Sequence, residues 1–289
     1  MRIARFSAPE GPRFAMADGA ALTGEGFRWL DLGLASQELQ EALLAGLIPS
    51  PGAEIWPELP YLAPLLPNRI FAIGRNYRAH AKERGEKVPT VPLVWVKLNS
   101  ALIGPGAPIL VPADHAEAID YEGELAVVIG KGGRRIAEVE ALTHVGAYTA
   151  ANDVTARDAQ DAMAQWTLPK SLPTFAPLGP HLLTADEIPD PQALIVETWL
   201  GEERRQQGST KDMIFSVAKL VSFLSEYVEL EVGDVIETGT PGGVGWSRKP
   251  RAMLHPGQEV EVRIEPIGSL RNPVLVEAVG RGGLPHSPS

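Results

Sequence analysis

The sequence predicts a β-rich α+β fold assembled from short strands. From Arg69 onward, short runs of β-branched and apolar residues alternate with Gly and Pro, and the predicted strands outnumber the predicted helices. The chain contains 29 Gly and 26 Pro, which favour many turns and short strands over a helical bundle. Hydrophobic residues make up 44% and charged residues 21%, which is ordinary for a globular protein and excludes global disorder.

The chain divides into a small N-terminal subdomain and a larger second unit. Its 289 residues exceed one average domain of about 150 residues. The first 67 residues end in a proline-dense run, which indicates a stiff connection. We therefore predict a subdomain over 1–67, a main domain over 68–279 and a flexible tail over 280–289.

Helical periodicity is limited to a few segments. Ser36 precedes a stretch in which Leu39, Leu43, Leu44 and Leu47 share one helical face, so one helix is expected in the N-terminal subdomain. Further helices are expected over 78–83, 156–165 and 214–226. Strands are expected over 70–73, 93–97, 109–111, 121–129, 145–151, 194–200, 234–237 and 260–265.

The net charge and the absence of long apolar runs limit the partners. The formal net charge is −10, so no basic stripe is available for a nucleic-acid backbone or an anionic membrane, and neither is an expected partner. No apolar run approaches the roughly 20 residues of a membrane helix, and the N-terminus lacks the apolar region of a secretory signal. We expect a cytoplasmic protein.

The sequence contains no cysteine. This excludes disulfides, thiolate zinc sites, iron–sulfur clusters and cysteine nucleophiles. Any metal ion must therefore be bound by oxygen or imidazole ligands.

Acidic residues interrupt an otherwise apolar strand in IDYEGELAVVIG. Because strand side chains alternate, Asp120, Glu122 and Glu124 are expected on one face, which Ala126 and Val128 continue as apolar residues. A half-solvated edge strand is the alternative. If the strand runs into the interior, the carboxylates need a cation or hydrogen bonds, and this pattern suits a hard divalent ion.

A third carboxylate follows the next apolar run. Asp153 is either a divalent-ion ligand at a strand end or the N-cap of the helix that follows it. Arg157 and Gln160 lie at i and i+3 on one face of that helix. An acidic ligand close to a cation suits a metal-bound carboxylate substrate.

Two further segments carry residues that can move protons or bind anions. Lys170 lies in LPKSLPTFAPLGP, whose prolines hold the chain extended, and its alternative is a solvated loop lysine. His80 and Glu83 lie at i and i+3 of a predicted helix, where the carboxylate can orient the imidazole as a general base. A surface ion pair is the alternative.

The run TGTPGGVG offers free backbone amides after a strand, but it lacks the G-K-[ST] of a Walker loop, so a tight turn is the default interpretation. No G-x-S-x-G, G-x-G-x-x-G or EF-hand pattern occurs. These absences disfavour a serine α/β-hydrolase, a Rossmann enzyme and a calcium sensor.

The order of these segments resembles that of the fumarylacetoacetate hydrolase superfamily. The matching segments, in the order of the family, are GRNYRAHAKE, DYEGELAVVIG, NDVTARDAQ, PKSLPTFAPLGP and GDVIETGTPGGVG. The resemblance implies a mixed β-roll of layered sheets over the catalytic domain 68–279, commonly in a homodimer. Residues 1–67 resemble the variable N-terminal piece of longer bacterial members.

The resemblance also assigns roles by position. It implies that Mg²⁺ or Mn²⁺ is bound by Glu122, Glu124 and Asp153. It makes His80 and Glu83 an acid/base dyad on a lid.

For the substrate, the resemblance assigns Lys170 to the oxo-acid end of a small 2-oxo acid. Positions that contact substrate in the family match Arg157, Gln160 and Thr240.

One position separates this sequence from fumarylacetoacetase proper, which carries an aspartate where this chain has Ile73. The chain is more similar to the bacterial acylpyruvase and 2-oxo-heptenedioate isomerase branch. The resemblance implies a metal-dependent hydrolase that cleaves a C–C bond in β-diketo acids of the acylpyruvate or fumarylpyruvate type, through a metal-stabilised enolate. The alternatives are a 2-oxo-diacid decarboxylase, an isomerase, dehydratase or lyase using the same site, and a catalytically silent relative.

Overall fold

The computed structural model describes residues 1–17, 29–52 and 59–278. The helices are α1 (Gln37–Leu44), α2 (Arg78–Glu83), α3 (Arg157–Ala162) and α4 (Val217–Tyr227). The strands of the first half are β1 (Arg2–Ala8), β2 (Gly11–Ala17), β3 (Leu30–Leu34), β4 (Ile70–Gly74), β5 (Leu93–Lys97), β6 (Leu102–Ile103), β7 (Ile109–Val111), β8 (Ile119–Asp120) and β9 (Gly123–Ile129). Those of the second half are β10 (Val145–Asn152), β11 (Thr155–Ala156), β12 (Ala176–Thr184), β13 (Ile195–Leu200), β14 (Glu203–Ser209), β15 (Val235–Glu237), β16 (Glu259–Ile264) and β17 (Gly268–Val276).

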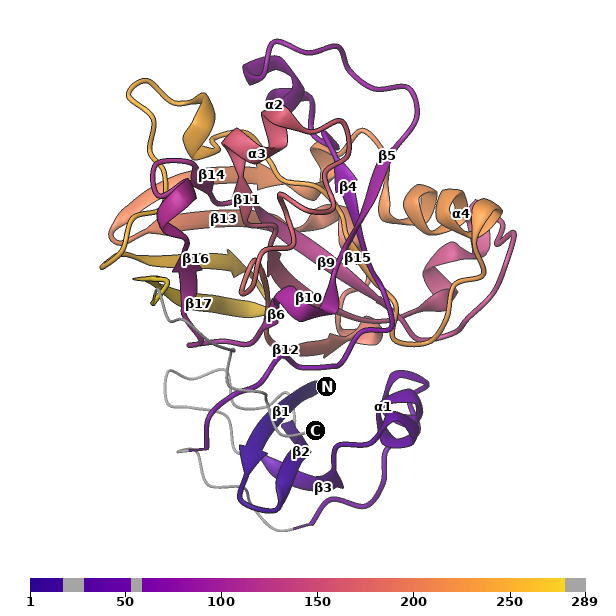
Figure 1. Cartoon of the computed structure of the whole chain (residues 1–289). Helices are drawn as coiled ribbons and strands as arrows, with labels where there is room; N and C mark the ends of the chain where they lie inside the picture. Colours follow the sequence, from indigo (N-terminus) through magenta and orange to yellow (C-terminus); the bar gives the residue numbers. More distant parts are fainter. Residues whose placement is uncertain (18–28, 53–58, 279–289) are drawn as a thin grey trace.

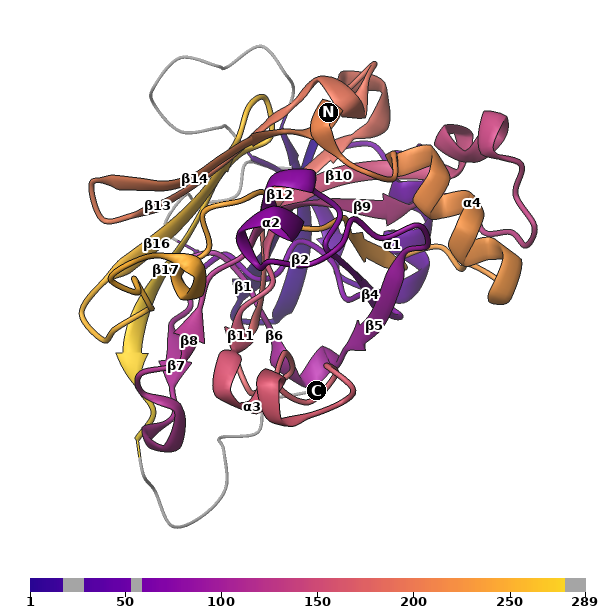
Figure 2. The same ribbon diagram turned by 90° about the horizontal axis from the view of Figure 1, so that it is seen from above.

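The strands form one large mixed sheet, one smaller sheet and one short ribbon. The large sheet has the order β3-β2-β1-β12-β10-β9-β15-β4-β5, with β6 paired to β12 beside this path. The second sheet has the order β14-β13-β16-β17-β7, and β8 pairs with β11. Figures 1 and 2 place α4 and the second sheet on opposite sides of the molecule. The predicted β-rich α+β fold of layered mixed sheets is confirmed.

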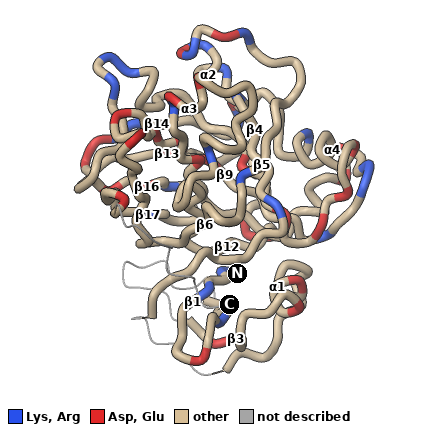
Figure 3. Tube along the Cα trace, viewed as in Figure 1, with Lys and Arg blue, Asp and Glu red and all other residues tan. Residues whose placement is uncertain are grey.

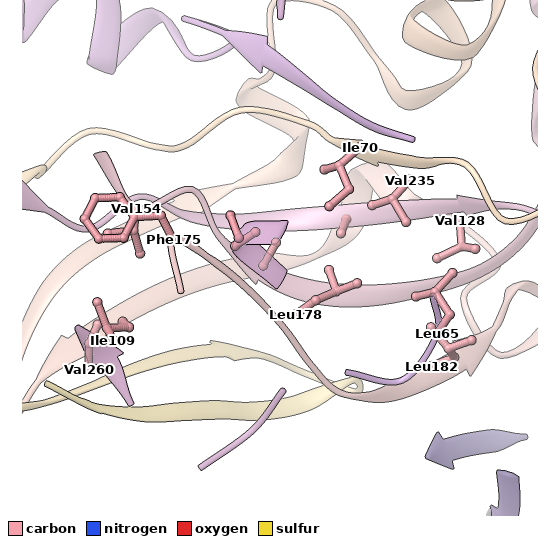
Figure 4. Packing of buried hydrophobic residues seen from close by; sticks show 14 of the residues in the cluster. Leu65, Ile70, Ile109, Val128, Val154, Phe175, Leu178, Leu182, Val235 and Val260 are labelled. Carbon is pink, nitrogen blue, oxygen red and sulfur yellow. The ribbon is translucent and has the colours of Figure 1, made fainter. Parts of the chain in front are cut away.

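Strand β9 lies near the centre of the large sheet and is buried along its whole length. Its alternating side chains enter two apolar clusters. Ala126 and Val128 belong to the cluster shown in Figure 4, whereas Leu125 belongs to a second cluster that includes the buried face of α4. A strand buried on both faces explains why its sequence is a nearly continuous apolar run after the two glutamates.

The predicted strand over 121–129 begins later than expected. Asp120 ends β8, and β9 starts only at Gly123. Between them, the amide of Tyr121 donates to the Asp120 carboxylate at 2.9 Å, and the amide of Glu122 donates to the Asn152 side chain at 2.9 Å. Side-chain oxygens thus take the place of backbone carbonyls as acceptors for these two amides. The strand pairing is therefore interrupted just before β9 begins.

The described part of residues 1–67 contains three strands as well as the predicted helix, and the sequence analysis missed these strands. Arg2 and Arg5 of β1 are themselves buried, so the strand shows no apolar and polar alternation. β1 pairs with β12 through Ile3 and Leu182, and the N-terminal strands thereby extend the large sheet. The boundary at residue 67 stays a prediction, and the predicted tail over 280–289 lies outside the described residues.

In the main domain the two-residue strands β6, β8 and β11 were also missed, as were the longer β12, β14 and β17, the longer ones for different reasons. β12 contains Pro177, Gly179 and Pro180, which are typical of turns, and β14 is almost entirely polar. β17 contains Pro273 near its end. The helices expected over 156–165 and 214–226 are real but shorter. None of the helices in the described part of the chain is both long and apolar enough to cross a membrane.

Gly123 is required because the two sheets approach most closely there. A Cβ atom on Gly123 would lie 2.1 Å from the Thr198 hydroxyl of β13 and 3.2 Å from Val262 of β16. Its amide donates to the Gln206 side-chain oxygen at 3.0 Å, and its carbonyl accepts from the Thr240 hydroxyl at 2.9 Å. This backbone contact fixes the position of the glutamates on either side.

We predict that Gly123→Ala lowers the free energy of unfolding by about 1–3 kcal/mol, because the added methyl group overpacks the space between β9 and β13. Urea denaturation of the purified variant measures this loss. The double variant Gly123→Ala/Thr198→Ala removes the nearest clashing atom and is expected to recover more than half of it. A double variant no more stable than Gly123→Ala would contradict this explanation.

Candidate active site

Three buried carboxylates converge where β9 begins and β10 ends. Glu122 precedes β9, Glu124 is its second residue, and Asp153 directly follows β10. β9 and β10 are antiparallel neighbours, and the Asp153 amide donates to the Glu122 carbonyl at 2.9 Å. One ligand oxygen from each of the three carboxylates lies within 4.8 Å of the others. The structure therefore brings together the three residues predicted as metal ligands. The antiparallel pairing of β9 and β10 places the start of one strand beside the end of the other.

Asp153 does not cap the helix that follows it. The N-cap of α3 is Ala156, which has no capping side chain, and the Ala159 amide of the first turn donates to Asp158 at 2.7 Å. The Asp153 carboxylate instead accepts from two buried lysines: from Lys97 at one oxygen, and from Lys170 at 2.6 Å at the other. The alternative role that the sequence left open for this residue is absent from the structure.

Lys170 is buried rather than solvated, with an exposed fraction of 1%. Its ammonium donates to Glu122 at 2.8 Å, to Asp153 at 2.6 Å and to the Thr155 hydroxyl at 2.8 Å. Burial disfavours the charged amine, but the two carboxylates outweigh it and raise the pKa of Lys170. Lys170 is thus a charged group that links two of the three acids.

Arg157 performs a similar task from α3. Its guanidinium donates to Asp120 at 2.8 Å, to Glu122 at 2.5 Å and to Gln160 at 2.9 Å. These bonds occupy the nitrogens that face the site, so in this structure Arg157 holds Glu122 in place and Gln160 orients the guanidinium. Asp120, which shares the acidic segment, is a partner of Arg157 rather than a member of the carboxylate triad.

His80 and Glu83 form a pair on α2 in which the imidazole is buried and the Glu83 side chain is 24% exposed. Nδ1 of His80 lies 2.8 Å from Oε1 of Glu83, and Nε2 of His80 faces Glu122 at 4.0 Å. The second oxygen of Glu83 accepts from the Gly243 amide at 2.8 Å. Glu83 is therefore fixed from two directions, and it presents the free imidazole nitrogen to the carboxylate cluster.

The loop over 238–245 reaches the same site. The Gly239 amide donates to Glu124 at 2.6 Å, and Thr240 bonds to the Gly123 carbonyl at 2.9 Å and to Gln206 at 2.8 Å. Gly239 has φ +100°, and a Cβ there would lie 2.6 Å from the Cβ of Asn76. The run TGTPGGVG is thus more than a turn, since it supplies backbone donors to the acidic cluster.

The charges of the cluster do not cancel. Burial alone would raise the pKa of Glu122, but Arg157 and Lys170 outweigh it and hold the pKa well below its usual range. The pKa of Glu124 is raised well above its usual range by burial and by the neighbouring charges of Asp153 and Glu237. The protein's own cations therefore do not compensate the charged form of Glu124, and the neutral acid is favoured.

Most of the predicted residues line one narrow cavity of about 20 Å³. Those on its wall are His80, Glu122, Glu124, Arg157, Gln160, Lys170 and Thr240. Asp153 and Glu83 lie directly behind it, each bonded to a residue of the wall. The structure gathers every candidate residue into one place.

Sequence reasoning missed several members of this site. Lys97 donates to Asp153 and is 1% exposed. Burial and the nearby acids raise the pKa of Glu237 to about 8, despite the opposing charges of Lys97 and Lys170. Each is the last residue of a correctly predicted apolar strand. A charged residue at the end of an apolar strand was the signal that could have identified both as site residues. Trp95 and Trp166, which meet edge to face at 5.2 Å on the cavity wall, gave none.

Comparisons with known proteins agree with this geometry. Residues 69–275 match the family described as fumarylacetoacetate (FAA) hydrolase C-terminal. The mitochondrial oxaloacetate tautomerase FAHD2B of Bos taurus is 36% identical over 293 residues, covering 95% of this chain and 92% of that protein.

Two solved structures are similar along nearly the whole chain. A fumarylacetoacetate hydrolase from Exiguobacterium antarcticum has a TM-score of 0.84 at 36% identity, covering 96% of this chain and 100% of the other. A 2-hydroxyhepta-2,4-diene-1,7-dioate isomerase from Mycobacterium marinum has a TM-score of 0.81 at 32% identity, covering 96% and 99%. Together with the matching family model, these similarities establish that the chain belongs to the fumarylacetoacetate hydrolase family.

Proposed function

We propose that this chain is a divalent-metal-dependent enzyme that interconverts the keto and enol forms of a short 2-oxo diacid of the oxaloacetate class. The observation that carries the proposal is the position of His80. Its Nδ1 is held by Glu83, and its Nε2 lies 4.0 Å from Glu122, one of three clustered carboxylates. A base next to a cation site is the arrangement that proton transfer beside a carbonyl group requires.

The residues present fit a divalent ion. Glu122, Glu124 and Asp153 offer only oxygen ligands, which hard cations such as Mg²⁺ and Mn²⁺ prefer. The uncompensated charge on Glu124 is the independent sign that a cation belongs there. When bound, such an ion would polarise the 2-oxo group of the substrate and lower the energy of negative charge on its oxygen.

His80 would move the proton. With Glu83 ionised, Nδ1 of His80 donates to it, which leaves the lone pair of Nε2 free to accept a proton from the carbon next to the oxo group. The same nitrogen can return that proton to the oxygen, so the reaction consumes no water. Glu83 acts by orienting the ring and by stabilising its protonated form.

Cations on the cavity wall would bind the substrate's carboxylates. Lys170 has its ammonium inside the cavity and can exchange one of its carboxylate partners for that of a substrate. Arg75 and Arg84 line the same cavity and supply positive charge for a second carboxylate. Gln160 and Thr240 complete the polar wall. Arg157 is saturated by its own partners, and we infer that it positions Glu122.

The choice of a four-carbon diacid rests on a relative of this chain and not on the cavity, whose volume of about 20 Å³ holds no more than about one water molecule. The same activity is printed in the name of the bovine relative, an oxaloacetate tautomerase that spans nearly the whole chain. Decarboxylation of a 2-oxo diacid and isomerisation of a double bond would use the same residues.

The second candidate is hydrolysis of a C–C bond in a β-diketo acid such as an acylpyruvate. The His80–Glu83 pair favours it as well, because an oriented imidazole can deprotonate a water that attacks the distal carbonyl. One of the similar solved structures is named a fumarylacetoacetate hydrolase. We keep the homodimer that the resemblance implies as a further part of the proposal.

Glu124→Gln should make the metal-free protein more stable and abolish its response to metal. The amide keeps the bond from Gly239 but removes the unpaired charge, so we expect the melting temperature in EDTA to rise by about 2 °C or more. Because the folded pKa of Glu124 is raised, its charge costs stability only above about pH 4.5, and the difference from wild type should grow as pH rises.

Thermal shift with EDTA, Mg²⁺ or Mn²⁺ measures both effects. The matched control is Glu226→Gln, which removes an exposed carboxylate on α4 and should leave the metal response intact. The metal assignment fails if wild type shows no metal-dependent shift, or if Glu124→Gln retains the wild-type shift.

His80→Ala should lose about 10²-fold or more of the metal-dependent conversion of enol-oxaloacetate, followed by enol absorbance, while it keeps the wild-type metal shift. His115→Ala is the control, because His115 forms a comparable pair with Asp158, 2.9 Å away, outside the cavity. In wild type we expect kcat/KM for oxaloacetate to exceed that for pyruvate release from acetylpyruvate at least 10-fold.

Unchanged turnover in His80→Ala would remove His80 from the mechanism. Faster turnover of acetylpyruvate than of oxaloacetate would instead establish the C–C hydrolase and refute the tautomerase.

A further inference from the structure

A second cavity, of about 410 Å³, lies outside the carboxylate site and is lined by cations. Its basic residues are Arg205, Arg248, Lys249, Arg251 and His255, and we call it the basic pocket. Figure 3 shows the run of Lys and Arg on the loop that follows Gly245–Ser247, at the upper left of the view. None of the residues that line the pocket is acidic.

The positive charge of the basic pocket is largely uncompensated. Arg205 pairs with the exposed Glu203 at 2.6 Å. Within the part of the chain that the structure describes, neither Arg248, Lys249 nor Arg251 has a carboxylate within ion-pair distance. The net charge of the chain is −10, but three unpaired cations around one cavity make the electrostatic potential positive there.

The cations are held in place rather than free in solvent. The guanidinium of Arg251 stacks on the ring of Trp246 at 3.3 Å, and the Trp246 amide donates to buried Asp120 at 3.0 Å. Arg248 donates to the Gly243 carbonyl at 3.1 Å and also to the carbonyl of Arg205. Guanidinium groups fixed in this way lose little entropy when they bind an anion.

The remaining wall and the volume suit a small metabolite. Leu200, Ala252 and Met253 give an apolar lining, and Met253 is 3% exposed. A cavity of about 410 Å³ is in the range of small-molecule sites, which combine apolar walls with a few directed polar groups. The carboxylate site, at about 20 Å³, is far smaller.

We propose that the basic pocket binds a small anion with two or more negative charges, carried on phosphate or carboxylate oxygens. Planar guanidinium groups bind such oxygens in pairs, and Lys249 adds a point charge at the rim. This site is separate from the carboxylate cluster and does not depend on the proposed tautomerase activity.

The pocket is also linked to the acid/base pair through one residue. The carbonyl of Gly243 accepts from Arg248 at 3.1 Å and from the Tyr121 hydroxyl at 3.2 Å, while its amide donates to Glu83 at 2.8 Å. An anion that binds Arg248 competes with the Gly243 carbonyl for the guanidinium. Occupancy of the pocket therefore changes the hold of Gly243 on Glu83 and on α2.

Isothermal titration of metal-free protein with pyrophosphate and with citrate, at constant ionic strength, tests binding and separates phosphate from carboxylate ligands. We expect at least one of them to bind wild type, and Lys249→Gln/Arg251→Gln to weaken that binding at least 10-fold. The control Arg134→Gln/Lys211→Gln removes the same charge at exposed positions outside the pocket and should bind as wild type does.

Equal affinity of wild type and Lys249→Gln/Arg251→Gln, or no binding of either anion, would overturn the proposal. Both substituted residues are exposed, and an unchanged melting temperature and metal-dependent turnover show that the variant is folded. If the variant is less stable, Lys249→Glu alone must weaken binding. If the wild-type protein shows no metal-dependent turnover, that result counts against the proposed function and not against the basic pocket.

Hydrogen exchange tests the link to α2. Saturating the better anion should change exchange of the amides over 78–85 at least 3-fold in wild type, and not in Arg248→Gln. Unchanged exchange in wild type, at an anion concentration that saturates the pocket, would refute the coupling through Gly243.

Discussion

The burial of three carboxylates within 4.8 Å of one another is the constraint on which the rest of this structure depends. Desolvated like charges repel strongly, so the fold must supply cations and donors at fixed positions. Lys170 bridges Glu122 and Asp153, and Arg157 holds Glu122 from α3. These cations do not compensate the charged form of Glu124, and its pKa is raised well above its usual range. The protein's own cations stabilise two of the acids, and we propose that a divalent ion stabilises the charged form of the third.

The surrounding elements can be understood as the supports of that cluster. Gly123 lets the second sheet pack against the strand that carries two of the acids, and Gly239 lets a loop bring its amide to Glu124. The same loop continues to Gly243, which bonds to Glu83 of α2 and so joins the proton-transfer pair to the sheet. The carboxylate cluster, the His80–Glu83 pair and this loop are therefore connected by hydrogen bonds, and we propose that an anion in the basic pocket acts on α2 through Gly243.

The sequence predicted local features of the fold and site more successfully than long-range ones. The strands over 93–97 and 109–111 and the helix over 78–83 follow from local periodicity, and they match the structure. The N-terminal strands escaped because Arg2 and Arg5 are buried by pairing with distant segments. Strand alternation and the position of acids at strand ends predicted the acidic triad. The contact of Lys97 with Asp153 joins residues 56 positions apart, so no local sequence pattern predicts it. The roles of the assembled residues came from family resemblance and stay proposals.

Anomalous diffraction from crystals of the Mn²⁺-loaded protein tests the central claim most directly, because it locates the ion without any assumption about the reaction. The account predicts one dominant peak per chain, contacted by an oxygen from each of Glu122, Glu124 and Asp153, with His80 outside the ligand set. A dominant peak elsewhere, or one that Glu124 does not contact, would contradict the claim that the uncompensated charge of this cluster exists to bind a divalent ion.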